Sequence, residues 1–155
     1  MIELVSLSGL SLQCREMMER DIDEIMRLEK SAHSHPWRRS SFEDCLKGRQ
    51  KCWVVEYKHK IVGYVVVTHG GGDAELLNLA VSPEMQRKGI GRLLLDHAMT
   101  LIHGKADMLF LEVRVSNRKA IELYSREGFF EVGNRKNYYP TVNGYEDALL
   151  MARQL

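Results

Sequence analysis

An apolar strand, a polar loop with glycines, an amphipathic helix and a second apolar strand follow one another between Ala74 and Val115. This order constrains the fold more than any other feature of the chain. The strands run over residues 74–81 and 108–115, and apolar side chains recur at helical spacing over 93–102. A strand–helix–strand unit closes with a right-handed crossover, which places its two strands parallel and adjacent. The chain is therefore predicted to form an α/β sheet around one parallel pair.

The residues before this unit predict an extended stretch, two helices and a hairpin. After the stretch at 10–17, Asp21-Ile-Asp-Glu24 has the form of a capping box, so the first helix is expected to start at Asp21. The segment 33–37 contains Pro36 and interrupts that helix, and Ser40-x-x-Glu43 then opens a short helix closed by Gly48. Strands at 52–57 and 61–69 should pair through a tight turn.

The residues after the unit complete the sheet. Ser116-Asn117 can cap a helix that carries Tyr124 and ends at Gly128. Two last strands, at 129–138 and 146–152, are expected to close the sheet antiparallel around a turn-rich segment. We therefore expect a single domain over residues 1–155, with a mixed, mostly antiparallel sheet, a parallel central pair and helices on both faces.

Charge and cysteine content exclude several function classes. Lys and Arg number 22 against 21 Asp and Glu, so the net charge gives no reason to expect nucleic-acid binding. The three cysteines form no CxxC pair, and an odd number argues against a secreted disulfide framework. Neither a targeting segment nor a membrane span is expected, and the cytoplasm is the predicted location. The spacing of His33, His35, Cys45 and Cys52 fits no zinc site, so no metal is expected.

The loop Gln86-Arg-Lys-Gly89-Ile-Gly91 joins a strand to a helix, where backbone N–H groups and the helix dipole favour a phosphate. Glycines at 89 and 91 let backbone approach an anion, while Arg87, Lys88 and Arg92 add positive charge. The dinucleotide fingerprint would need Gly or Ala where Leu94 stands, and the P-loop ending Gly-Lys-Ser/Thr is missing. Taken alone, the pattern leaves a pyrophosphate site or a plain connecting loop.

Four segments in order resemble the GNAT family of N-acetyltransferases. The loop 86–91 matches the family's Gln/Arg-x-x-Gly-x-Gly/Ala coenzyme A signature, and similar segments stand at 79–81, 111–117 and 120–129. His33-x-His-Pro-Trp37 and Arg135-Lys-Asn-Tyr-Tyr-Pro140 further resemble the branch that acetylates the amino-terminal alanine of a small-subunit ribosomal protein. The resemblance covers about residues 12–152 and leaves the role of the first ten residues open.

The resemblance implies acetyl-CoA as co-substrate. In family members the strand at 79–81 splays from its neighbour and pairs with the pantetheine arm, and the N–H at Val81 resembles the donor that polarises the thioester. Asn117 resembles a coenzyme contact, although it can equally be a helix cap. The residues expected to bind the coenzyme are Leu79, Ala80, Val81, Arg87, Lys88, Gly89, Ile90, Gly91, Arg92 and Asn117.

Acetyl transfer to an amine needs a neutral amine and a proton for the leaving thiolate. Tyr124 resembles the family's general acid, against the alternative that its ring only packs in the core. Glu112 resembles the proton acceptor, acting through water. A carboxylate in an apolar strand is otherwise expected to be paired, and Arg114 lies on the same face two residues on.

By resemblance, Trp37, Tyr138 and Tyr139 wall a cleft for the acceptor, although the two tyrosines can also just fill a strand pair. The leading hypothesis is direct acetylation of a protein's amino-terminal α-amine in a ternary complex, with a ribosomal protein as partner and without nucleic acid or membrane. The alternatives are acetylation of a lysine or small amine, and a non-catalytic acyl-CoA sensor.

Overall fold

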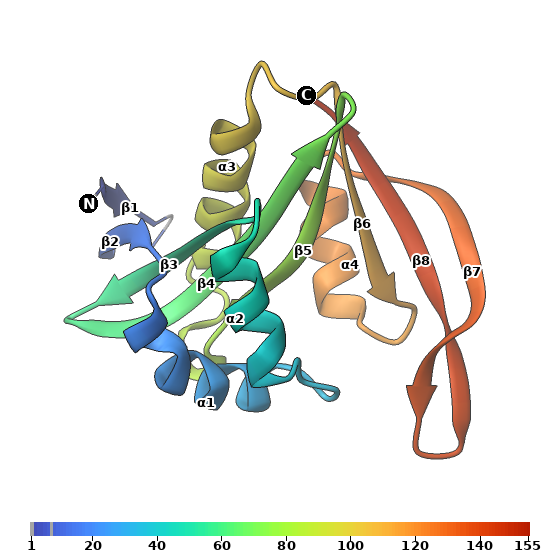
Figure 1. The fold of residues 1–155 in the computed structure, drawn as a ribbon, viewed down its shortest axis with the longest axis horizontal. Coiled ribbons are helices and arrows are strands. Elements are labelled where there is room, and N and C mark those ends of the chain that lie inside the picture. The colour runs from blue at the N-terminus through green and yellow to red at the C-terminus, as the bar shows by residue number, and fades with distance from the viewer. Residues whose placement is uncertain (1, 7) are drawn as a thin grey trace.

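The computed structural model describes residues 2–6 and 8–155. Within them the chain forms one eight-stranded sheet in the order β1-β2-β3-β4-β5-β6-β8-β7 (Figure 1). The strands are β1 (Ile2–Val5), β2 (Ser11–Glu16), β3 (Lys51–Tyr57), β4 (Lys60–Gly70), β5 (Asp73–Val81), β6 (Met108–Arg114), β7 (Phe130–Thr141) and β8 (Gly144–Gln154). β5 and β6 are parallel and the other neighbours antiparallel, which confirms the predicted mixed sheet.

Helices cover both faces of the sheet. They are α1 (Ile22–Ala32), α2 (Arg39–Lys47), α3 (Ile90–Ile102) and α4 (Arg118–Arg126), with 3-10 turns η1 (Glu19–Asp21) and η2 (Pro83–Met85). α1 packs on β4 and β5 and α2 on β3, while α3 packs on the other face of β4 and β5. Because both faces of β4 are covered, seven consecutive residues of that strand are buried.

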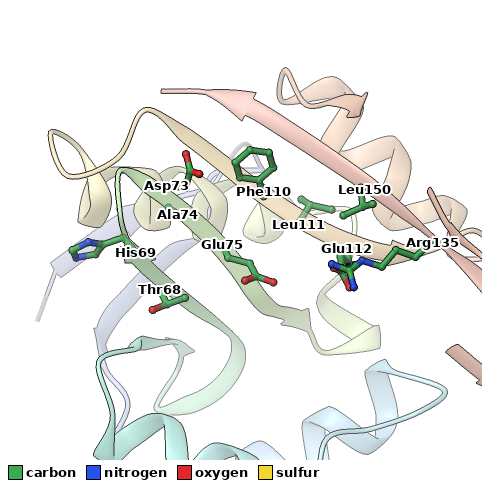
Figure 2. A pocket seen from close by; sticks show the side chains of 11 residues that line it. Thr68, His69, Asp73, Ala74, Glu75, Phe110, Leu111, Glu112, Arg135 and Leu150 are labelled. Atoms are coloured by element: carbon green, nitrogen blue, oxygen red, sulfur yellow. Dashed lines mark ion pairs between the residues drawn. The ribbon is translucent and has the colours of Figure 1, made fainter. Parts of the chain in front are cut away.

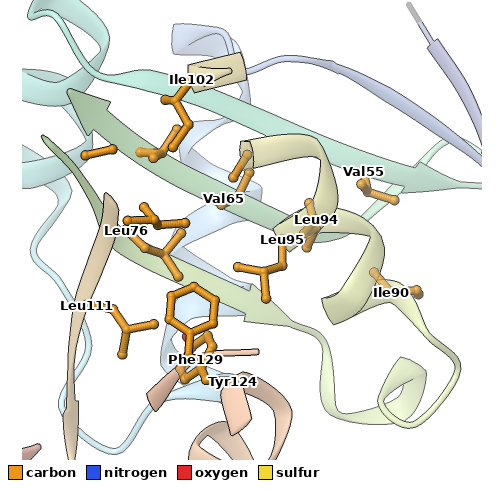
Figure 3. Close-up of a cluster of buried hydrophobic side chains, with 14 of the residues drawn as sticks. Val55, Val65, Leu76, Ile90, Leu94, Leu95, Ile102, Leu111, Tyr124 and Phe129 are labelled. Carbon is orange, nitrogen blue, oxygen red and sulfur yellow. The ribbon is translucent and has the colours of Figure 1, made fainter. Parts of the chain in front are cut away.

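Two apolar cores result, one on each face. The core under α3 and α4 includes Leu94, Leu95, Val65, Leu111 and Tyr124 (Figure 3). The core under α1 and α2 includes Ile22, Ile25, Phe42, Val54 and Tyr64. α1 buries residues 22, 25, 28 and 29, the spacing of one helical face.

The capping box predicted at Asp21 is wrong, and Ser40 does not open α2, although both helices start within a residue of the expected position. The Asp21 carboxylate accepts from Arg15 at 2.8 Å through both oxygens and from the Met18 N–H at 2.8 Å, so it is not available to cap α1. α2 begins at Arg39 with no side-chain cap, and Ser40 lies inside the helix. Charged and tertiary partners took precedence over the local capping pattern at Asp21.

Both hairpins form at the positions that the sequence predicts, but their strands differ in length from the predicted ones. Lys58 and His59 both have positive φ, as a tight two-residue turn between β3 and β4 requires. β7 and β8 extend further than predicted and meet at residues 142–143. Ile2–Val5, in the segment whose role the sequence leaves open, form β1 as an edge strand along β2.

His97 on α3 is a buried polar residue in the first core. Its ring lies edge-on to Trp53 with centroids 4.3 Å apart, and Nε2 has no hydrogen-bond partner among the described residues. Burial lowers the pKa of this imidazole below its ordinary value because the charged form would be desolvated.

This shift predicts acid sensitivity. Below about pH 6.5 the unfolded chain binds a proton that the folded His97 resists, so the contribution of His97 to stability is present at neutral pH and is lost as pH falls. The effect is at most about 1.4 kcal/mol per pH unit. Urea unfolding at pH 7.5 and 5.5 should show a smaller stability loss for His97→Phe than for the parent, whereas equal losses would contradict the assignment.

Candidate active site

The parallel pair at the centre of the sheet opens partway along its length. β5 pairs with β6 from Asp73–Met108 to Leu76–Leu111, and the ladder ends there. At the same point β5 contains a bulge, because Val67 pairs with Leu76 and Val66 with Asn78, which leaves Leu77 as the extra residue. A bulge bends its strand and increases the local twist. β5 and β6 therefore diverge beyond Leu76, as Figure 1 shows.

Hydrogen-bonding direction alternates from residue to residue along β5, so the backbone groups that do not bond to β4 point into this gap. The Ser82 N–H donates to the Val62 carbonyl at 2.8 Å, so Ala80, two residues earlier, also directs its backbone groups at β4. Leu79 and Val81 direct theirs at the gap. The Gln86 side-chain amide donates to the Val81 carbonyl at 3.2 Å from that side, which leaves the Val81 N–H facing the gap.

The predicted anion loop leads from the end of β5 into α3. Arg87 and Gly89 have φ of 63° and 86°, and Gly89 is the left-handed N-cap of α3, a conformation that favours glycine. The first intrahelical bond of α3 runs from the Leu93 N–H to the Gly89 carbonyl at 3.1 Å. The N–H groups at 90–92 precede this bond and have no acceptor within the helix, an arrangement that favours an anion at a helix N-terminus.

Gly91, at the end of the loop, and Arg92, which follows it, have structural roles that the sequence did not indicate. A Cβ on Gly91 would lie 3.2 Å from Leu123 Cδ2, so glycine here permits close packing of α3 against α4 as well as access to an anion. Arg92 pairs with Glu127 at 3.2 Å, which partly neutralises the charge that we expected it to contribute. Arg87 is exposed and Lys88 is half-buried.

α4 brings Tyr124 to the same region. Asn117 caps the helix, with its side-chain oxygen accepting from the Ala120 N–H at 3.3 Å, so the capping alternative holds for that oxygen. The Tyr124 ring is 7% exposed and packs on Phe129 with centroids 5.6 Å apart. Burial, with Tyr139 as a second cause, raises the pKa of the Tyr124 hydroxyl, which stays protonated at neutral pH.

Glu112 pairs with Arg135 of β7 at 3.1 Å rather than with Arg114, which corrects the partner that the sequence suggested. Arg114 instead bonds Glu146 at 3.1 Å and stacks on Tyr139, its guanidinium 4.4 Å from the ring centroid. The cause is strand register: β8 pairs with β6 and places β7 at the sheet edge, so the ion-pair partners lie 23 and 32 positions away in the chain.

A pocket of about 500 Å³ lies beside Glu112 on the face that carries α1 and α2 (Figure 2). Leu109, Leu111 and Val113 of β6 are buried under α3 and α4, so the alternate residues Phe110 and Glu112 point to the opposite face. The lining comes from β4, β5, β6, β7 and β8: Thr68, His69, Gly70, Asp73, Ala74, Glu75, Phe110, Leu111, Glu112, Arg135 and Leu150.

Glu75 is a pocket residue that the sequence analysis missed. Partial desolvation, together with the nearby Glu112 charge, raises the pKa of the Glu75 carboxyl, and Arg135 opposes this shift. The alternation of β5 carried a signal, since Asp73 and Glu75 stand opposite the apolar Ala74 and Leu76. Only the pairing of β5 with β6 brings Glu75 beside Glu112.

The aromatic residues expected to line the acceptor cleft lie in different parts of the fold. Tyr138 and Tyr139 contact each other on β7 with centroids 5.0 Å apart. Burial, followed by the Glu112 charge, raises the pKa of Tyr139 to about 12, which places this residue near the Glu112 end of the site. Trp37 lies in the loop between α1 and α2 and packs on Phe42 at 5.1 Å, so part of its ring belongs to the second core.

Two further features of the described residues concern metal ions and membranes. No group of three or more His, Cys, Asp and Glu residues within 2–6 and 8–155 has an arrangement that would hold a metal ion. Over the same residues, none of the helices combines the length and apolar character needed to cross a membrane.

Known proteins resemble this chain in sequence and in fold. The chain is 37% identical over 133 residues to the [ribosomal protein bS18]-alanine N-acetyltransferase of Escherichia coli, covering 85% of this chain and 90% of that relative. It is 39% identical over 140 residues to a putative enzyme of the same name from Bacillus subtilis, covering 88% and 91%. The crystal structure of the ribosomal-protein-S18-alanine N-acetyltransferase from Escherichia coli superposes with a TM-score of 0.85 at 34% identity, covering 92% and 93%.

The family assignment follows from these likenesses and from the sheet itself. A model of the acetyltransferase (GNAT) family matches residues 19–129, which include the α1–α2 loop, the bulged β5, the anion loop and Tyr124. The superposed Escherichia coli structure covers 92% of this chain, a larger share than the family model matches. The chain belongs to the acetyltransferase (GNAT) family.

Proposed function

We propose that this enzyme transfers the acetyl group of acetyl-CoA to the α-amine at the amino terminus of a protein in the cytoplasm. The observation that carries the proposal is the gap between β5 and β6, which opens a strand edge inside the sheet and leads to the N-terminus of α3. An unpaired edge suits an extended amide-bearing arm, and the helix end suits its pyrophosphate. Acetyl-CoA has both parts in that order.

The residues proposed to bind acetyl-CoA contribute different groups. The backbone groups of Leu79 face the gap and pair with the pantetheine arm, and the Val81 N–H polarises the thioester carbonyl. Ala80 bonds to β4 and contributes packing. At the other end, N–H groups of Ile90, Gly91 and Arg92 meet the pyrophosphate after Gly89, with Arg87 and Lys88 beside it and the Asn117 amide as a further donor.

In the proposed reaction, the proton acceptor and the proton donor lie on opposite faces of the sheet. The acceptor enters from the pocket, where Glu112 takes its proton through water, and the neutral amine attacks the thioester carbonyl. A carbon–nitrogen bond forms and the carbon–sulfur bond breaks. Tyr124, on the α4 side, gives its proton to the leaving thiolate, and the second proton that the attacking nitrogen loses as the amide forms restores the phenol through solvent. Its raised pKa keeps that proton available, and the transfer needs assistance because a phenol is a weaker acid than a thiol.

The acceptor assignment rests on the relatives and on the pocket. Both sequence relatives are named as acetyltransferases of the alanine of ribosomal protein bS18, and we extend that acceptor, an amino-terminal alanine, to this chain. Trp37, Tyr138 and Tyr139 are the proposed walls for the acceptor chain. An α-amine titrates near 7.7 to 8.0 and a lysine near 10.4, so at neutral pH about a tenth of the first is already neutral.

A peptide with an amino-terminal alanine and an internal lysine tests this function. After incubation with acetyl-CoA, tandem mass spectrometry should locate the acetyl group on the α-amine, and a peptide with a blocked amino terminus should gain none. Predominant lysine acetylation would refute the α-amine assignment within the acetyltransferase family. Failure to acetylate any amine while binding acetyl-CoA would favour the sensor alternative.

Tyr124→Phe should lower kcat and leave the affinity for acetyl-CoA unchanged, because only the hydroxyl is removed from a ring that stays packed on Phe129. General-acid catalysis typically contributes about 100-fold to 10,000-fold. Single-turnover rates and calorimetry of donor binding would separate the two effects. An unchanged chemical step would leave Tyr124 as a packing residue.

Glu112→Gln should lower kcat/KM and alter the limb of the pH profile that reports amine deprotonation. Glu146→Gln is a matched control, because both carboxylates are 18% exposed and both pair with an arginine at 3.1 Å. If the two variants lose activity equally, Glu112 acts only through its ion pair.

A further inference from the structure

A fully buried carboxylate lies outside the groups used by the proposed reaction. Glu29, near the end of α1, is 1% exposed within the second core. Its Oε1 accepts from the Tyr64 hydroxyl of β4 and from the Asn78 side-chain amide of β5 at 3.2 Å. Its Oε2 accepts from the Trp37 backbone N–H at 2.9 Å. One side chain thus joins α1, the central strands and the α1–α2 loop.

The loop has a second attachment to the same network. His33 Nε2 lies 3.2 Å from Asn78 Oδ1 and 3.6 Å from Glu29 Oε1, and the His33 N–H donates to the Glu29 carbonyl at 3.0 Å. The segment from His33 to Trp37 is therefore held at one end by the Glu29 carbonyl and by Asn78, and at the other end by the Glu29 carboxylate. Beyond the loop, α2 begins at Arg39.

The network touches β5 at the position where that strand leaves β6. Asn78 is one residue after the bulge at Leu77 and one residue before Leu79, whose backbone faces the gap. The carboxylate that anchors the loop therefore also anchors the donor strand. Figure 1 shows the α1–α2 loop extending away from its helices toward the β6 and β8 side of the sheet.

A buried charge is tolerated only with its donors in place, and each charge-assisted bond is stronger than a neutral one. Burial and the adjacent Glu29 charge raise the pKa of Tyr64 well above its ordinary value, so Tyr64 remains a neutral donor. A loop attached in this way has its conformation before any acceptor arrives, which lowers the ordering cost of binding.

We propose that Glu29 is a positioning residue for the acceptor: it holds the α1–α2 loop, with Trp37, against the bulged part of β5 so that the acceptor cleft is formed in advance. This proposal rests on the proposed function for its acceptor. Glu29 itself is inaccessible to either substrate, so it acts through the Trp37 backbone and through Asn78.

Glu29→Gln is the test variant, because glutamine keeps the shape but replaces one acceptor oxygen with an NH₂ that faces another donor. The KM for an amino-terminal alanine peptide should rise about 10-fold or more, as expected for loss of a charge-assisted hydrogen bond that organises the loop. The Kd for acetyl-CoA and the kcat at saturating peptide should stay close to those of the parent.

A spectroscopic readout reports the loop without any turnover. The chain has two tryptophans, so Trp53→Phe leaves Trp37 as the only one. In that background, acrylamide quenching of Trp37 fluorescence should increase when Glu29→Gln is added. Tyr64→Phe, which removes one donor from a residue that no substrate can reach, should shift both KM and quenching in the same direction by less.

Glu24→Gln is the matched control on the same helix. The Glu24 carboxylate accepts from the Ile61 N–H at 2.8 Å and bonds to no loop residue, so its loss should affect stability without changing KM or quenching. Equal effects of Glu24→Gln and Glu29→Gln, or no effect of Glu29→Gln, would overturn the proposal. Quenching that depends on Glu29 in a protein that acetylates no amino-terminal peptide would refute the acceptor and retain the loop-holding role.

Discussion

The structure depends on the early end of the hydrogen-bond ladder between β5 and β6. A sheet normally pairs its backbone groups along each strand, and unpaired buried groups are costly. Here the pairing stops at Leu76 and Leu111, and the bulge at Leu77 turns the following residues away. β4 and β8 continue to hold the outer side of each strand, so the sheet opens at its centre without losing its edges. The Leu79 backbone groups and the Val81 N–H face this opening, while the Val81 carbonyl is bonded to the Gln86 side chain.

This gap also connects two faces that the sheet would otherwise separate. α3 and α4 lie on one face with the anion loop and Tyr124, while Glu112 and its pocket lie on the other. A donor bound at the N-terminus of α3 and an acceptor in the pocket can meet only where β5 and β6 diverge. In the proposed reaction, the proton acceptor and the proton donor therefore come from opposite faces, which keeps the two proton transfers apart.

Charged side chains in this enzyme lie in two different kinds of environment. Glu112 keeps 18% exposure and an arginine partner, a setting in which a carboxylate can exchange a proton with water. Glu29 is sealed among fixed donors, a setting that holds geometry and excludes water. Asp21, bonded to Arg15 and to the Met18 N–H, joins η1 to β2 in the same way.

The sequence by itself determined the order of the main elements from β2 onward, the parallel pair and the glycine-bearing loop before α3, because each depends on apolar spacing or on a local backbone requirement such as the positive φ of Gly89. The four matched segments also gave the family. Only the tertiary structure decided which groups meet. Arg135 rather than Arg114 pairs with Glu112, Glu75 joins the pocket, and Glu29 ties the loop to Asn78. These contacts join residues far apart in the chain. They depend on strand register and on a single-residue bulge, and neither leaves a periodic signature in the sequence.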